Sequence, residues 1–197
     1  MYYISWIPSI FCLILVILTL PCSSVNTTEF SEVYALKTMY DALNGEYWDW
    51  RATNISGNIW NFSDTAANPC NELWQGIACS CSLNTNVCNI VSISLNSYGL
   101  IGTFSDLRNL SLLSHLDLSN NAISGSLYTI PNMTQLIFLK LDHNLLTGDI
   151  ASVSHLSQLT YLSLDTNYFS GDISTIGNLT LLNTLDLGIF IHTPFYS

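Results

Sequence analysis

The stretch LSHLDLSNNAISGSLYTIPNMTQ, residues 113–135, runs directly into LIFLKLDHNLLTGDIASVSHLSQ, residues 136–158, and the two align without a gap. Leucine stands at positions 1, 4 and 6 of both segments, asparagine at position 9 and glycine at position 13. The same 23-residue frame starts again at Ile90, Leu159 and Leu182. A period of this length is typical of a solenoid, in which stacked repeats share one continuous core.

Each recurring position of the repeat has a mechanical reason. Apolar residues at positions 4 and 6 alternate, which places both side chains on the inner side of a short β-strand. Asparagine at position 9 suits the bend that follows, because its amide can pair with backbone groups that the bend leaves open. Glycine at position 13 permits a positive φ or a close backbone approach. Apolar residues at positions 15, 18 and 21 predict a return through 3₁₀-like turns.

Ahead of the repeats, apolar residues with helical spacing predict an α-helix. These residues are Val33, Leu36, Tyr40 and Leu43. Ser31 is a suitable N-cap, and Asn44 followed by Gly45 is a suitable stop. A tryptophan-rich stretch comes next, and then CNELWQGIAC at residues 70–79. We expect these elements to cover the N-terminal end of the solenoid, because an open end would expose its core.

These motifs resemble those of a known family. The repeat is similar to the plant-type leucine-rich repeat, LxxLxLxxNxLxGxIPxxLxxLxx, although it is one residue shorter and mostly lacks the proline; this resemblance covers residues 90–188. CNELWQGIAC resembles the plant-type N-terminal cap, and the preceding ALKTMYDALNGEYW, residues 35–48, resembles the caps of microbial and protist repeat proteins. Together with the repeats, these motifs resemble plant and protist receptor-like repeat ectodomains. The resemblance implies an α/β fold. It would be a leucine-rich-repeat solenoid wound as a right-handed superhelix, with short parallel strands on the concave face, a 3₁₀ or irregular convex side and a helical, disulfide-linked cap.

The four cysteines of the cap are expected to form two disulfides. The resemblance implies that Cys70 pairs with Cys79, and pairing of Cys81 with Cys88 is then the simplest completion. Four cysteines allow three connectivities, so the sequence alone does not decide between them. A zinc site is the alternative. The Cys-x-Cys spacing of Cys79 and Cys81 is poor for chelation, and an oxidising compartment favours disulfides.

The N-terminal residues indicate export from the cytoplasm. Residues 4–20 form an apolar run, and small residues follow, so we expect a signal peptide cleaved near Ser24; an uncleaved anchor is the alternative. Six Asn-x-Ser/Thr sequons support passage through a glycosylating compartment. They stand at Asn26, Asn54, Asn61, Asn109, Asn132 and Asn178. We therefore expect a secreted or cell-surface glycoprotein.

The chain divides into four parts. The predicted parts are a signal peptide (1–24), the cap (25–89), about four and a half repeats (90–189) and an irregular tail (190–197). In the fifth repeat Phe190 stands where asparagine is expected and Pro194 where glycine is expected. This break favours a truncated copy of a longer protein, such as a receptor-like ectodomain whose membrane span lies further on.

Composition and motifs disfavour several classes of function. The chain has 14 Asp and Glu residues against 4 Lys and Arg, and no basic run, so it does not suit nucleic acid. We find no Ser/His/Asp order, phosphate-binding loop or metalloprotease motif, so we expect neither an enzyme nor a cofactor. Asp142 and Asp165 should be stacked neighbours near Asp117 and His143. An ordinary polar face is the preferred interpretation, with a calcium site or an acid/base pair as alternatives.

The residues between the inward leucines should face the concave surface. Phe138 and Tyr161, flanked by His115, are the main interaction candidates because aromatic side chains anchor interfaces; an ordinary cross-strand ladder is the alternative. The candidate ligand-binding residues are His115, Asp117, Phe138, Lys140, Asp142, Tyr161 and Asp165. Three sequons fall at position 20, on the convex or flanking side, where sugar would leave the concave face open.

The leading hypothesis is an extracellular module that recognises a protein, peptide or glycan through its concave face. The alternative functions are a structural or adhesion scaffold and a truncated ectodomain of a receptor-like protein or kinase. Membrane attachment is expected only with an uncleaved leader or a membrane span beyond this sequence.

Overall fold

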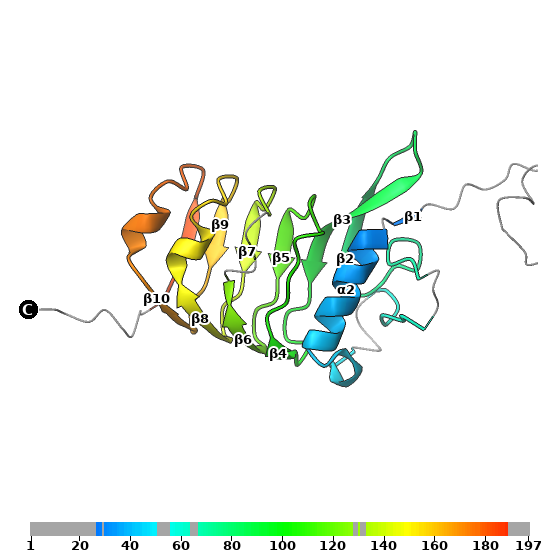
Figure 1. The fold of residues 1–197 in the computed structure, drawn as a ribbon, viewed down its shortest axis with the longest axis horizontal. Coiled ribbons are helices and arrows are strands. Elements are labelled where there is room, and N and C mark those ends of the chain that lie inside the picture. Colours follow the sequence, from blue (N-terminus) through cyan, green and yellow to red (C-terminus); the bar gives the residue numbers. More distant parts are fainter. Residues whose placement is uncertain are drawn as a thin grey trace, which may run out of the picture.

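The computed structural model describes residues 27–28, 30–50, 56–63, 67–127, 130 and 133–188. It confirms a leucine-rich-repeat solenoid whose turns stack along one axis, with a helical cap at the N-terminal end (Figure 1). Outside the described residues lie the predicted leader, the predicted tail, and Asn26, Asn54 and Asn132. None of the described helices is long and apolar enough to cross a membrane.

A parallel sheet, which receives one strand from each repeat, forms the concave face. Its repeat strands are β3 (Val87–Ser94), β5 (His115–Asp117), β7 (Phe138–Lys140), β9 (Tyr161–Ser163) and β11 (Thr184–Asp186). The register sets equal repeat positions side by side, so that His115 faces Phe138 and Phe138 faces Tyr161. Leucines at positions 4 and 6 point inward, and Leu139 and Leu162 are fully buried. Leu185 lies in β11, at position 4 of the fifth repeat. It is 41% exposed, because no strand follows β11 within the described residues.

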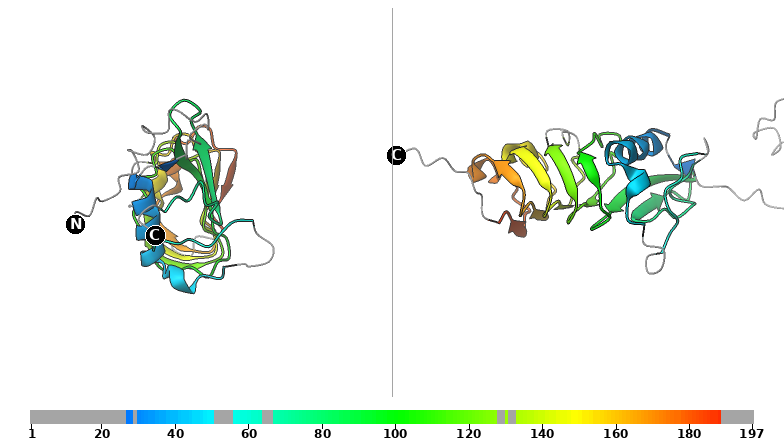
Figure 2. Two further views of the ribbon diagram at one scale, coloured as in Figure 1. Left: turned by 90° about the vertical axis from the view of Figure 1, so that its right-hand side faces the viewer. Right: turned by 90° about the horizontal axis from the view of Figure 1, so that it is seen from below.

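A second parallel sheet runs beside the first and was not predicted. Its strands are β4 (Ile101–Thr103), β6 (Ala122–Ser126), β8 (Leu145–Asp149) and β10 (Tyr168–Ser170). It lies along the lower edge of Figure 1 and is seen from below in Figure 2. The short helices η3 (Ile150–Val153) and η4 (Ile173–Ile176) follow it, as the three-residue spacing predicted. Asp149 and Asp172 cap these helices by accepting hydrogen bonds from backbone N–H groups.

The asparagine of each middle repeat performs the expected role at the bend. The side-chain oxygen of Asn144 accepts a hydrogen bond from the N–H of Ile123 at 3.0 Å. Its amide donates to the carbonyls of Leu118 and Leu141 at 2.9 and 3.0 Å. Asn121 and Asn167 make equivalent bonds one repeat away on either side. The result is an asparagine ladder that ties neighbouring turns together.

The repeat glycine has both of the properties expected of it. Gly148 has a φ of +104°, and a Cβ at this position would lie 2.5 Å from the hydroxyl oxygen of Ser126 in the preceding repeat. The position therefore needs the left-handed backbone and also the absence of a side chain.

The cap contains one α-helix and two strands that extend the concave sheet. Helix α2 (Phe30–Ala42) begins one residue before Ser31, so the predicted N-cap is wrong: Ser31 is already helical. The predicted stop is confirmed, because Asn44 takes the left-handed conformation with a φ of +57°. The helix lies on the side opposite the concave sheet (Figure 2). The short helix η1 (Gly45–Tyr47) follows it.

The buried side of helix α2 agrees in part with the predicted apolar residues, of which Leu36 and Leu43 are buried. Ala35, Leu36 and Met39 are buried together with Leu43, whereas Val33 and Tyr40 are half-buried. The C-terminal end of the helix also closes the edge of the second sheet, where Asn44 donates from its amide to the carbonyl of Ile101 at 2.7 Å.

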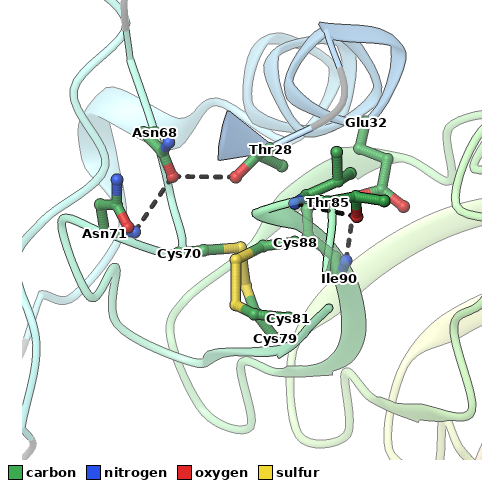
Figure 3. The surroundings of a disulfide bond; sticks show 11 residues. Thr28, Glu32, Asn68, Cys70, Asn71, Cys79, Cys81, Thr85, Cys88 and Ile90 are labelled. Carbon is green, nitrogen blue, oxygen red and sulfur yellow. Dashed lines mark hydrogen bonds between the residues drawn. A yellow bond between two sulfur atoms is a disulfide. The ribbon is translucent and has the colours of Figure 1, made fainter. Parts of the chain in front are cut away.

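Both expected disulfides are present, Cys70 with Cys79 and Cys81 with Cys88 (Figure 3). The second joins β2 (Ile77–Cys81) to β3 across their antiparallel pair. The strand β1 (Thr27–Thr28) pairs with the start of β3. All four thiols are used in bonds to sulfur, so the zinc alternative does not apply.

Aromatic rings fill the interior of the cap. The buried members are Trp48, Trp60, Trp74 and Tyr98, and Tyr40, Trp50 and Phe62 pack against them. The indole N–H of Trp60 donates to the carbonyl of Gln75 at 2.9 Å, so this buried polar group is satisfied. The cap and the repeats thus share one apolar core.

Candidate functional site

Three rings on neighbouring strands of the concave face form a continuous stack. The centroids of His115 and Phe138 are 4.1 Å apart with the ring planes at 3°, and those of Phe138 and Tyr161 are 4.4 Å apart at 14°. The strand spacing of about 4.8 Å brings equal repeat positions this close. His115 is exposed, and the other two rings are half-buried. The predicted neighbours therefore form one aromatic ridge, defined here as His115, Phe138 and Tyr161.

The stacking decides which parts of the ridge a ligand could touch. Both faces of Phe138 are covered by its neighbours, so its solvent-accessible part is the ring edge. The outer faces of His115 and Tyr161 look toward the small residues Ser92 and Thr184, their partners in the sheet register. Ring edges carry partial positive charge, and ring faces partial negative charge. In the middle of the ridge, a ligand would therefore meet the apolar edge of the Phe138 ring, which carries a weak partial positive charge.

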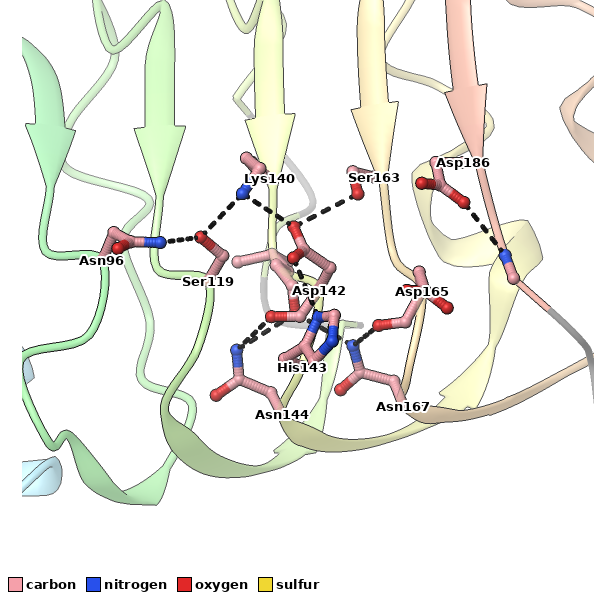
Figure 4. A network of polar contacts seen from close by, with 12 residues as sticks. Asn96, Ser119, Lys140, Asp142, His143, Asn144, Ser163, Asp165, Asn167 and Asp186 are labelled. Carbon is pink, nitrogen blue, oxygen red and sulfur yellow. Dashed lines mark hydrogen bonds and ion pairs between the residues drawn. The ribbon is translucent and has the colours of Figure 1, made fainter.

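A polar network lies beside the ridge and crosses four strands (Figure 4). Its centre is Asp142, only 7% exposed. Lys140 Nζ lies 3.2 Å from Asp142 Oδ1, and the hydroxyl of Ser163 donates to the same oxygen at 3.2 Å. Nδ1 of His143 lies 3.1 Å from the other carboxylate oxygen. This carboxylate is therefore held and neutralised by its own neighbours.

The network continues from Lys140 toward the cap. Lys140 also donates to the hydroxyl of Ser119 at 3.0 Å. That hydroxyl donates to Asp117 at 2.6 Å and accepts a hydrogen bond from the amide of Asn96. Ser119 is fully buried, so its hydroxyl is a fixed link of the network. The lysine thus bridges the predicted residues Asp117 and Asp142 through one buried serine.

Two carboxylates at the C-terminal end of the concave face have no cationic partner among the described residues. Asp165 and Asp186 make no ion pair among the described residues (Figure 4). Asp186 accepts one hydrogen bond, from the N–H of Gly188 at 3.2 Å. The described part of the chain contains no group of three or more His, Cys, Asp or Glu side chains arranged to hold a metal ion. These carboxylates leave the C-terminal part of the concave face negatively charged.

A pocket opens at the other end of the face, between the cap and β3. Its volume is about 480 Å³. The cap contributes Leu73, Trp74 and Ile77, and the first repeat contributes Ser94 and Asn96 from the concave rows. Ser56, Gly57, Gly76 and Tyr98 complete the lining. The concave face therefore runs from an uncharged hollow at the cap, past the aromatic ridge, to open carboxylates.

The sequence predicted the rows of this face but not all of its parts. All seven predicted residues lie on the face, and the structure joins His115, Phe138 and Tyr161 in one group and Asp117, Lys140 and Asp142 in another. Asp165 stays apart from both groups. Ser119, Ser163 and the pocket were missed as functional features. The repeat frame already placed Ser119 and Ser163 in the same rows as the predicted residues, so their position was a usable signal.

The described sequons lie away from these groups. Asn61, Asn109 and Asn178 are all exposed. Asn109 lies between β4 and β5, and Asn178 lies between η4 and β11, so neither is in a strand of the concave face.

No protein-family model matches the chain. Over 92 residues the chain is 34% identical to a probable LRR receptor-like serine/threonine-protein kinase of Arabidopsis thaliana, which covers 46% of this chain and 9% of that protein. Over 120 residues it is 35% identical to Protein STRUBBELIG-RECEPTOR FAMILY 3 of the same plant, covering 57% of this chain and 13% of that protein. The matched part is about a tenth of the length of these curated relatives.

Solved structures extend the similarity to most of the chain. The LRR ectodomain of the receptor kinase SOBIR1 from Arabidopsis thaliana superposes with a TM-score of 0.64 and 28% identity, over 81% of this chain and 79% of that chain. A chain of the BIR3–SERK2 complex from the same plant gives 0.63 and 27%, over 79% and 80%. The resemblance seen in the sequence is thereby confirmed: the chain is similar to the extracellular leucine-rich-repeat domains of plant receptor kinases.

Proposed function

We propose that this chain is an extracellular recognition module that binds an extended segment of a protein partner along its concave face. The observation that carries the proposal is the aromatic ridge, which lies beside the polar network centred on the Lys140–Asp142 pair. Recognition, and not catalysis, is proposed because Asp142, the most buried carboxylate of the face, is already paired with Lys140.

The geometry of the ridge favours a protein segment over a sugar. Sugars pack on open aromatic faces, whereas stacking covers both faces of Phe138. An apolar ring edge suits contact with aliphatic side chains and with backbone carbonyl oxygens. The hydroxyl and amide groups beside the ridge can pair with the polar backbone of an extended chain.

The charges of the face indicate a basic partner. Asp165 and Asp186 leave two negative charges without a cation among the described residues, and the whole chain has a formal net charge of −10. Lysine or arginine side chains of a ligand would supply the missing partners and would be steered toward the face. Such a segment would need about six residues, because the five repeat strands span roughly 19 Å and an extended chain advances about 3.3 Å per residue.

The relatives support the extracellular and recognition parts of this proposal. They include a probable receptor-like kinase and a receptor-kinase ectodomain, and one of the similar structures is the complex of BIR3 with SERK2. We also propose the division into signal peptide (1–24), cap (25–89), repeats (90–189) and tail (190–197). In the glycosylated protein, sugars on Asn109 and Asn178 would leave the concave face open to its partner.

The test uses the glycosylated, secreted protein and an array of synthetic peptides of about eight residues with systematically varied charge. We expect capture of peptides that combine basic and aliphatic residues, and loss of about thirtyfold in affinity in the variant Tyr161→Ser, as for an interface anchor. Tyr168→Ser is the matched control, because Tyr168 belongs to the same repeat, is 65% exposed and lies on the second sheet.

Two outcomes would overturn the proposal. One is equal loss of affinity in Tyr161→Ser and Tyr168→Ser. The other is capture of ligands on a glycan array with no capture on the peptide array.

A further inference from the structure

The pocket between the cap and the first repeat is large enough to take a bound side chain. Its volume of about 480 Å³ falls in the range of ordinary ligand sites. Leu73, Trp74 and Ile77 of the cap form its apolar wall. Ser94 and Asn96 form the side next to the concave face. The pocket is thus built from two parts of the chain that the fold brings together.

None of the described residues that line the pocket carries a charge. A charged group in the pocket would give up hydration without gaining an ionic partner, which is unfavourable. An aliphatic or aromatic side chain would instead replace water against Leu73 and Ile77. The polar rim of Ser56, Ser94 and Asn96 could pair with the adjoining backbone. The chemistry of the lining therefore selects an uncharged, apolar group.

The pocket and the concave face are one continuous surface. The register of the sheet sets Ser94 beside Asp117. The amide of Asn96 donates to the hydroxyl of Ser119, which in turn accepts from Lys140. A ligand that lies along the face would therefore meet the pocket as the next feature beyond the polar network.

One wall residue projects into solvent without a role in the core. Leu73 is 69% exposed, although the backbone around it is fixed. Its carbonyl accepts a hydrogen bond from the N–H of Asn58 at 2.8 Å, and the next N–H, of Trp74, bonds to Pro69 at 3.0 Å. A leucine held in place yet open to water is available to a ligand and can be changed without removing core contacts.

We propose that this pocket binds an apolar terminal residue of the segment that occupies the concave face. The inference rests on the proposed function and gives the ligand a direction. Its apolar end lies at the cap, and its basic residues lie near Asp165 and Asp186. The pocket thereby fixes the register of the ligand along a face whose repeated rows would otherwise allow it to slide.

The experiment measures the affinity of fluorescent peptides by anisotropy. The probes share one basic body and differ at one end, which carries leucine, phenylalanine, alanine or lysine; a second set carries the variation at the other end. We expect leucine or phenylalanine at one end to bind about tenfold more tightly than alanine, from burial of the side chain, and lysine to bind no better than alanine.

Two protein variants, Leu73→Ala and Ser94→Phe, and one control test whether the end preference of the peptides arises in the pocket. In Leu73→Ala the advantage of a leucine end over an alanine end should fall at least threefold, because contacting groups give non-additive effects. Leu83→Ala is the matched control: it is the same change in the same cap, at a residue that is 97% exposed and outside the pocket. Ser94→Phe, which would fill the pocket from β3, should remove the end preference.

The outcomes separate the two proposals. If the end preference is absent, or is equal in Leu73→Ala and Leu83→Ala, the pocket assignment is wrong even where Tyr161→Ser weakens binding. If the preference depends on Leu73 while Tyr161→Ser has no effect, the pocket stands and the concave-face function falls. If no peptide binds, both proposals are overturned.

Discussion

The carboxylate of Glu32 in helix α2 accepts a hydrogen bond at 2.9 Å from the backbone N–H of Ile90, 58 residues further along the chain (Figure 3). Strand β2 pairs along one edge of β3, so β1 and β5 share the other edge. β1 reaches Cys88 and β5 begins its pairing at Ser92, which leaves the N–H of Ile90 between them. Glu32 fills this gap and joins the cap to the first repeat.

The first prediction concerns this contact. Replacing Glu32 with alanine leaves the buried N–H of Ile90 without its acceptor, and we expect the free energy of unfolding to fall by about 1–3 kcal/mol. Glu32→Gln retains a side-chain oxygen and should lose less. Urea denaturation of the purified variants measures both losses of stability, with the exposed Glu46→Ala as control. Equal stability of Glu32→Ala and Glu46→Ala would contradict the assignment.

A second prediction addresses the asparagine ladder. Asn144→Ala would leave the buried N–H of Ile123 without its acceptor. The carbonyls of Leu118 and Leu141 would each lose one of two donors and keep the amides of Asn121 and Asn167. We expect a loss of about 1–3 kcal/mol, mainly from the unsatisfied N–H. Asn144→Asp should not restore full stability, because a carboxylate cannot donate to the two carbonyls. The exposed Asn183→Ala is the control, and thermal unfolding is the measurement.

The ladder was predictable from sequence because it follows the period of the repeat. Leucines, asparagines and glycines recur at fixed positions, so Asn144 and Gly148 could be assigned their roles before the structure was known. The aromatic neighbours Phe138 and Tyr161 follow from the same frame. The face-to-face stacking of the two rings could not be predicted from the repeat frame, because it depends on the rotamers of both side chains.

The second sheet was missed for a physical reason. Its strands are three to five residues long; β6, β8 and β10 each contain one buried residue, at position 11, and β4 contains none. At most one buried residue per strand is too little alternation to distinguish a strand from a loop. The pocket was missed because Leu73 and Ser94 have no periodic relation; only the packing of the cap on β3 brings them together.

A third prediction follows from the environment of Tyr40. Burial against Trp48 and Phe62 raises the pKa of the Tyr40 phenol above its usual value of 10.0, and the nearby Glu46 adds to this. The folded protein then keeps a proton that the unfolded chain releases. This contribution to stability is complete below pH 10 and is lost as the pH rises through the folded-state pKa.

Tyr40→Phe should therefore lose less stability than the natural chain on passing from about pH 9 to pH 11. Urea denaturation across this range measures the difference, with Tyr34→Phe as a control on the exposed side of the same helix. A parallel pH dependence in Tyr40→Phe and the natural chain would show that burial of this phenol does not contribute.

The last prediction concerns Lys140, which holds the centre of the concave network. Lys140→Met removes the cation from Asp142, whose side chain is only 10% exposed, and leaves a nearly buried carboxylate without its ionic partner. We expect a loss of about 1–3 kcal/mol, because an uncompensated buried charge is more harmful than a missing pair. The double variant Lys140→Met with Asp142→Asn should recover most of this loss, since it removes the charge that needed a partner. Lys37→Met is the control: its pair with Asp41 is exposed, and its loss should change stability by less than about 0.5 kcal/mol. If the double variant were no more stable than Lys140→Met, the lysine would act through packing and not through charge, and the ionic pairing of Asp142 with Lys140 would not be what stabilises the network.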